Sequence, residues 1–164
     1  MIKNRGFTIV ELIIYMGIMS VLLLVLTDLF ISVLDIQSES EVTSAIQQDG
    51  RYILTRLNYD LTQVKTITTP TLGTTTPNLI VTISGQTYSY QLTGPNLTLS
   101  INGAPGNQLN SYASSISGLT FTRLGNGIGK EDTIRISFDL TSIVNRSNGP
   151  QTTNFLTTVG LRPN

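Results

Sequence analysis

The fold of this chain is decided close to its start, in the segment Gly6-Phe7-Thr8-Ile9-Val10-Glu11. Behind it, the sequence from Leu12 to Leu26 is apolar except for one serine. An acidic residue at the centre of a membrane-spanning helix costs about 2.5–3.5 kcal/mol even on the lowest scales, so such residues usually have a partner and a function. The first question that the sequence poses is therefore what Glu11 pairs with.

Composition excludes several classes of function. The chain has 164 residues, a formal net charge of zero, and only 12% charged residues. The few Lys and Arg residues are scattered and form no basic stripe, which argues against nucleic-acid binding. Cysteine and histidine are absent, so there are no disulfides, and the commonest metal ligand and general base are missing. We expect no enzyme, no cofactor and no metal site.

A short basic leader precedes the apolar run. Residues 1–6 contain Lys3 and Arg5 but no acid, and positive charge at this place keeps the N-terminus of a membrane helix in the cytoplasm. A secretory signal peptide would need a small-residue cleavage site after the apolar region, and residues 27–34 contain none. A plain signal anchor is a second interpretation, but it gives Glu11 no role.

A third interpretation rests on a resemblance. Lys3-Asn4-Arg5-Gly6 followed by Phe7-Thr8-Ile9-Val10-Glu11-Leu12 resembles the prepilin signal of type IV pilins and type II secretion pseudopilins. The resemblance implies that prepilin peptidase cleaves between Gly6 and Phe7 and that Phe7 becomes N-methylated. It also implies that Glu11 is the glutamate of filament assembly. The implied partners are other pilin or pseudopilin subunits, the peptidase, the pilus assembly platform and, before assembly, membrane lipid.

The charges at this end support that role on physical grounds. Cleavage would leave a free amine on Phe7 beside a carboxylate, and opposite charges attract strongly where the dielectric constant is low. Residues 7 and 11 are spaced to meet within one helix. In a staggered bundle, Glu11 of one subunit could instead meet Phe7 of its neighbour and fix the axial register. We favour the intermolecular pairing as a hypothesis.

The sequence divides into four segments: the leader 1–6, a transmembrane or filament-core helix 7–34, an amphipathic helix 35–65 and a β-rich domain 66–164. Segment 7–34 spans roughly 40 Å as a helix, more than a hydrocarbon core of about 30 Å. We expect one long helix, with Gly50 as its weak point because glycine costs about 1 kcal/mol relative to alanine. The apolar stripe of the second helical segment consists of Val42, Ile46, Ile53, Leu57, Leu61 and Val64.

A looser pattern refines the resemblance. The arrangement of Arg51, Arg56-Leu57, Asp60-Leu61 and Gln63, together with the ending 157–162, is similar to minor pilins and pseudopilins of the J and W types. Arg56 and Asp60 could pair at the surface, worth about 0.3–0.5 kcal/mol. A solvated helix face and a subunit contact both remain open for these charged residues.

The remainder reads as an antiparallel sheet. Segment 66–78 has the composition of a loop, and strand-like runs follow at 79–84, 86–92, 97–101, 119–124, 133–140 and 154–161. Ser84-Gly85 and Asn102-Gly103 mark tight turns. Residues 125–132 read as a solvated turn, because Glu131 and Asp132 alone make a weak calcium ligand set. We predict an α+β fold in which the long helix lies on one antiparallel sheet.

The function that we predict is that of a minor pilin or pseudopilin. A C-terminal disulfide loop is absent, and Asp28 stands where many major pilins have a helix-bending proline. Both departures from the family pattern argue against a major pilin. The alternative from another class is a signal-anchored extracytoplasmic protein that binds a ligand.

Overall fold

The computed structural model describes residues 7–125, 132–144 and 149–161. The predictions that concern Lys3, Arg5, Gly6, Glu131 and Arg162 therefore lie outside the described residues. The chain forms two compact units, residues 1–40 and residues 41–164. The first unit is helical where it is described, and the second combines helix and strands.

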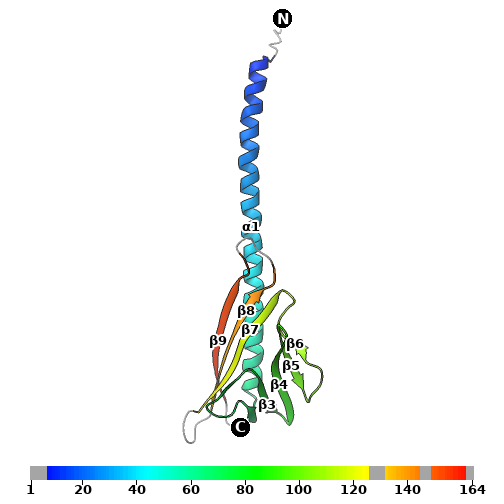
Figure 1. Cartoon of the computed structure of the whole chain (residues 1–164), viewed down its shortest axis with the longest axis vertical. Coiled ribbons are helices and arrows are strands. Elements are labelled where there is room, and N and C mark those ends of the chain that lie inside the picture. Colours follow the sequence, from blue (N-terminus) through cyan, green and yellow to red (C-terminus); the bar gives the residue numbers. More distant parts are fainter. Residues whose placement is uncertain (1–6, 126–131, 145–148, 162–164) are drawn as a thin grey trace. The chain divides into compact units, whose positions relative to one another are not determined.

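The long helix predicted from the sequence is confirmed. Helix α1 covers Ile9–Leu61 and contains 53 residues, and Figure 1 shows the strands gathered around its second half. All six residues of the predicted apolar stripe, from Val42 to Val64, are buried. Five of them, from Val42 to Leu61, recur on one face of the helix, and Val64 lies just beyond its last residue. Together they form one side of the core of the second unit.

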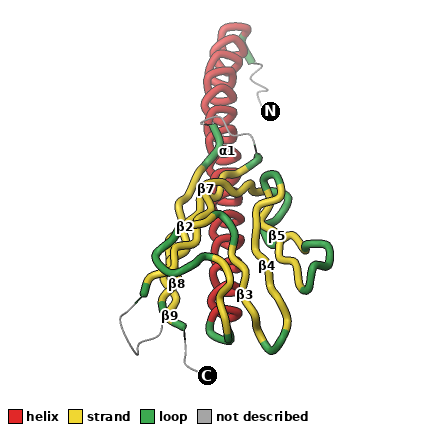
Figure 2. The backbone as a smooth tube through the Cα atoms, turned by 60° about the horizontal axis from the view of Figure 1, so that its bottom comes forward, coloured by secondary structure: helices red, strands yellow, loops and turns green. Residues whose placement is uncertain are grey.

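The strands form two sheets, whereas the sequence predicted one. Every pairing is antiparallel, and Figure 2 shows the strands arranged about the helix. The first sheet has the order β1-β3-β4-β5-β6, with β1 Thr66–Thr69, β3 Leu79–Ile83, β4 Gln86–Thr93, β5 Asn96–Ile101 and β6 Asn107–Gln108. The second has the order β2-β7-β8-β9, with β2 Thr75–Thr76, β7 Ser114–Leu124, β8 Thr133–Ser142 and β9 Thr152–Gly160.

The chain changes from one sheet to the other in segment 66–78 and again between β6 and β7. Segment 66–78 was predicted as a loop, but it contributes β1 to the first sheet and β2 to the second. Between β6 and β7, the buried Asn110 accepts a hydrogen bond from the Leu97 amide at 3.0 Å and donates to the Ser114 carbonyl at 2.8 Å. Its side chain thus ties the first sheet to the start of the second.

The turn predictions are confirmed by the backbone. Ser84 and Gly85 have φ values of 49° and 81°, as a two-residue turn of the mirror-image type requires. Asn102 and Gly103 have φ values of 53° and 76°, and the Ala104 amide donates to the Ile101 carbonyl at 3.0 Å.

Gly50 has a role that the sequence did not reveal. It is buried inside α1, and a Cβ atom at this position would overlap the Phe155 ring of β9. The Phe155 ring in turn stacks on Phe138, with ring centroids 5.4 Å apart. Gly50 was predicted to be a weak point of the helix. In the structure it is also the place where the Phe155 ring of β9 lies against the helix.

This contact predicts the sign of a substitution. Gly50→Ala should destabilise the second unit by roughly 1–3 kcal/mol, because overpacking against Phe155 outweighs the gain in helix propensity. The measurement is denaturant unfolding of the full-length chain in detergent micelles.

Two controls accompany it. Gly17→Ala, where nothing lies within 4 Å, should not destabilise the chain. Adding Phe155→Leu to Gly50→Ala should cost less than the sum of the two single changes, since the smaller side chain relieves the overlap. A Gly50→Ala variant as stable as the original chain would contradict the assignment.

Candidate functional site

The start of α1 is closed by a reciprocal pair of hydrogen bonds between Thr8 and Glu11. The Glu11 amide donates to Oγ1 of Thr8 at 3.2 Å, and the Thr8 amide donates to Oε2 of Glu11 at 3.3 Å. The Thr8 hydroxyl also donates to Oε2 at 3.4 Å. This arrangement is a capping box, which satisfies amides that the first helical turn leaves without partners.

Glu11 therefore has a partner in its own chain. The Phe7 amine was the only partner predicted for Glu11 from the sequence, although a threonine followed three residues later by glutamate before an apolar run is the pattern of a capping box. The Glu11 carboxylate is bonded to the residue that directly follows Phe7. The ring of Phe7 lies against Tyr15, with centroids 5.8 Å apart and planes inclined by 59°.

The helix behind this cap is apolar and uncovered. From Phe7 to Ile36, the large apolar side chains are between 48% and 77% exposed. By length and composition α1 could cross a membrane, with a mean hydropathy of 2.6 over its most apolar window. The segment lacks a hydrophobic partner within its own unit, so it requires either lipid or other helices around it.

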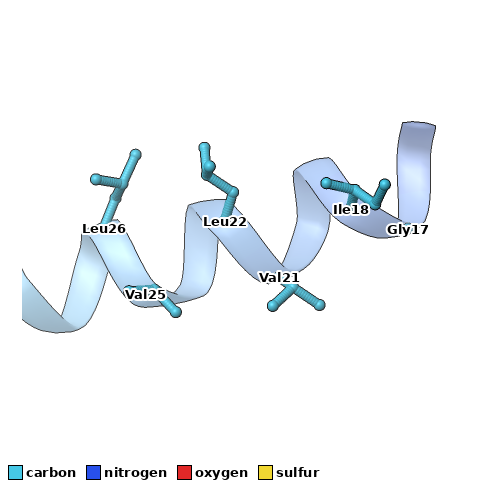
Figure 3. A pocket seen from close by; sticks show the side chains of 6 residues that line it. All are labelled: Gly17, Ile18, Val21, Leu22, Val25 and Leu26. Carbon is cyan, nitrogen blue, oxygen red and sulfur yellow. The ribbon is translucent and has the colours of Figure 1, made fainter. Parts of the chain in front are cut away.

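A shallow hollow lies on this segment. Gly17, Ile18, Val21, Leu22, Val25 and Leu26 line it (Figure 3). It has a volume of about 510 Å³, and a Cβ atom at Gly17 would meet nothing within 4 Å. Every wall belongs to the same helix, so the hollow encloses no ligand. It is a groove that a lipid chain or the side chains of a second helix could fill.

Comparison with known protein families finds a motif at the N-terminus. Residues 1–27 match the family model described as the prokaryotic N-terminal methylation motif. The match supports a type IV pilin-like prepilin signal at the start of the chain. Neither the curated proteins nor the solved structures include a match to this chain.

A second polar cluster lies where α1 ends. Arg56 donates from Nε to Oδ2 of Asp60 at 2.8 Å, and the buried hydroxyl of Tyr90 on β4 donates to the same oxygen. The prediction of an Arg56–Asp60 pair is confirmed. A solvated helix face is wrong for Asp60, whose exposed fraction is 3%. Tyr90, whose buried side chain reaches Asp60 from β4, contributes to this burial.

Other charged and polar side chains tie the second unit together. Oδ2 of Asp49 on α1 accepts hydrogen bonds from the amide and hydroxyl of Ser111, at 3.0 and 2.7 Å. Arg123 on β7 donates to Oδ2 of Asp132 at 2.7 Å and to the Ile67 carbonyl of the first sheet at 3.2 Å. Asp132, one half of the weak calcium pair, is thus an ion-pair partner. Within the described residues, no group of three or more acidic, His or Cys side chains could hold a metal.

The Asp60 cluster predicts a dependence of stability on pH. Burial, and next the hydrogen bond to Asp60, raise the pKa of Tyr90 above its ordinary value of 10.0. The contribution of Tyr90 to stability is therefore complete below about pH 10 and is lost as the pH rises above it. The Tyr90 phenol should ionise only when the chain unfolds, which ultraviolet absorbance during a pH titration would detect.

Variants at Tyr90 and Asp60 separate this effect from general alkaline unfolding. Tyr90→Phe should remove the pH-dependent part and cost about 1 kcal/mol at neutral pH. Asp60→Ala should cost more, since it leaves the buried phenol without an acceptor. If Tyr90 ionises near pH 10 while the chain is still folded, the assignment is wrong.

Proposed function

We propose that this chain is a minor pilin or pseudopilin, a structural subunit of a type IV pilus or a pseudopilus similar to that of type II secretion. Prepilin peptidase cleaves it between Gly6 and Phe7, and Phe7 is then N-methylated. The 7–34 segment holds the precursor in the cytoplasmic membrane with its N-terminus inside. On assembly the segment leaves the lipid and packs among the same segments of other subunits.

The observation that carries this proposal is the match of residues 1–27 to the prokaryotic N-terminal methylation motif. The uncovered apolar surface of the first unit supports it, because a filament core of packed helices would bury that surface as lipid does. The buried core of the second unit is complete among its own residues. This unit would therefore pass unchanged from the membrane to the filament.

Glu11 would have a function both in the single chain and in the filament. In the single chain it caps its own helix through Oε2. In the filament, the same carboxylate would also meet the methylated amine of Phe7 on a neighbouring subunit. A buried ion pair of this kind contributes less to stability than to register, since its attraction is largely offset by desolvation.

We further propose that the chain is a minor pilin or pseudopilin of the J or W type. Arg51, Arg56 and Asp60 match the pattern on which it rests, and Asp60 and Arg56 hold the end of α1 to β4. The β-rich domain would face outward as a recognition surface or as a contact in a tip complex.

Mass spectrometry of the protein from its source tests the processing. The mature chain should begin at Phe7 and should carry one additional methyl group on that residue. A chain that keeps residues 1–6 would overturn the proposal and favour the signal-anchored ligand-binding protein. Substitution of Gly6, which should block cleavage, is the matched negative control.

Two substitutions of Glu11 separate its roles. Glutamine can replace glutamate in a capping box, so Glu11→Gln should keep the helix start while removing the charge, and Glu11→Ala should remove both. If the charge sets register, both variants should be cleaved and membrane-bound but should fail to enter filaments. The measurement is the amount of subunit in sheared filaments relative to the membrane fraction.

The opposite result is equally informative. Normal incorporation of Glu11→Gln with loss of Glu11→Ala would reduce Glu11 to a helix cap. In that case the register of the filament would come from apolar packing alone.

A further inference from the structure

Strand β9 ends the second sheet with an open edge. It pairs with β8 over its whole length, from Thr133↔Gly160 to Thr141↔Thr152, without a register shift. Among the described residues, the sheet order places no strand on its other side, and Figure 1 shows β9 at the margin of the sheet beside α1. The edge is nine residues long and carries neither charge nor proline. Charged residues and proline are features by which proteins commonly protect such edges from pairing with another strand, and β9 lacks both.

The other three edges are short or irregular. Strands β2 and β6 have two residues each. Strand β1 has four, includes a register shift between Ile67 and Thr69, and is followed by Pro70. β9 is therefore the one long, regular edge among the described strands.

Two hydrogen bonds determine which backbone groups of β9 face outward. The Ser142 amide donates to the Gln151 carbonyl at 2.8 Å, and the Leu161 amide donates to the Asp132 carbonyl at 3.0 Å. Both bonds belong to the register of the β8–β9 ladder. In an antiparallel ladder hydrogen-bonded pairs alternate with pairs that point away. The residues whose N–H and C=O groups point away from β8 are Thr152, Asn154, Leu156, Thr158 and Gly160.

A groove on α1 runs beside this edge. Thr43, Ser44, Gln47, Gln48 and Arg51 line it, and its volume is about 410 Å³. Thr43, Gln47 and Arg51 are four residues apart and form one ridge of the helix. The ridge starts where the Thr43 hydroxyl donates to the Gln151 side chain at 2.8 Å, and it passes Gly50, which lies under Phe155. It therefore follows the first part of β9 and the residue before it, from Gln151 to Phe155.

The groove is lined by residues with polar side chains, one of which, Arg51, carries a positive charge. Arg51 is exposed, and the ion pairs found among the described residues are Arg56–Asp60 and Arg123–Asp132. A strand added outside β9 would place every second side chain over this ridge. An acidic side chain there would meet Arg51. The other face of the added strand would cover Leu156, which is 62% exposed.

We propose that the β9 edge and the Thr43–Arg51 groove form a docking site for an extended strand of a different protein chain. The strand runs antiparallel to β9, with polar side chains and one acidic group turned to the groove and apolar side chains beside Leu156. Addition of a strand to a sheet edge is an established mode of peptide recognition, in which backbone hydrogen bonds give affinity and side-chain contacts give specificity.

A second copy of this chain does not fit the site. The β9 strand of a second copy carries no charged side chain, so it would bring no acidic group to Arg51. The other sheet edges among the described residues, β1, β2 and β6, have four residues or fewer and are too short to match β9.

The test uses the full-length chain in detergent micelles and a synthetic nine-residue probe. In the probe, valine on one face alternates with threonine on the other, and one central threonine is replaced by glutamate. A matched peptide has lysine at that place. Amide exchange measured by NMR should show slowed exchange of Thr152, Asn154, Leu156, Thr158 and Gly160, with Phe155 already protected. The glutamate peptide should bind roughly threefold to tenfold more tightly than the lysine peptide.

Two variants complete the design. Arg51→Glu should reverse the preference between the two peptides, and because Arg51 is exposed the fold should be unchanged. Leu156→Pro removes an outward amide that β8 does not use, so it should abolish binding of both peptides while Phe155 stays protected. Leu72→Lys is the control: it changes an exposed apolar residue elsewhere and should leave binding intact.

Several results would overturn the proposal. They are absence of binding, equal affinity for the two peptides, and protection that falls outside the five amides. Slow exchange of those amides in the free chain would mean that the edge is already covered. If that protection grows with the concentration of the chain, the occupant is a second copy. Retention of the leader, which would refute the proposed processing, leaves this experiment unaffected.

Discussion

The constraint on which the structure depends is the unequal burial of apolar surface. In residues 41–164, the apolar stripe of α1 is covered by two sheets, and side chains such as Ile53 and Leu57 are fully buried. In residues 7–36, large apolar side chains remain about half exposed or more. At about 25 cal/mol per Å² of apolar surface removed from water, that segment gains strongly from lipid or from neighbouring helices. This segment therefore needs to lie in lipid or among other helices.

The parts of the fold that depend on local chemistry could be predicted from the sequence. The stripe from Val42 to Val64 follows from helical periodicity, and the turn at Ser84-Gly85 follows from the need for positive φ. The division into two sheets could not be predicted, because segment 66–78 gives one short strand to each sheet. The contact of Gly50 with Phe155 joins positions far apart in the sequence. A single sequence shows the glycine but not the ring that requires it.

The same distinction applies to the polar sites. The pairing of Arg56 with Asp60 follows from a spacing of four residues on a helix, but the burial of Asp60 depends on Tyr90 from β4. The bond between Thr8 and Glu11 is local, and its pattern was present in the sequence. This bond was not predicted, because Glu11 was treated only as a charge near lipid. A carboxylate at a helix start can act first as a hydrogen-bond acceptor.

The geometry of the cap bears on how Glu11 could serve two partners. Both hydrogen bonds that its carboxylate accepts from Thr8 go to Oε2, and an ionised carboxylate has two acceptor oxygens. The second oxygen could therefore accept a bond from the amine of a neighbouring subunit without opening the cap. The cap would hold the carboxylate in place beforehand, so that less side-chain entropy is lost when the subunits meet. On this argument, helix capping and filament register are successive uses of one side chain.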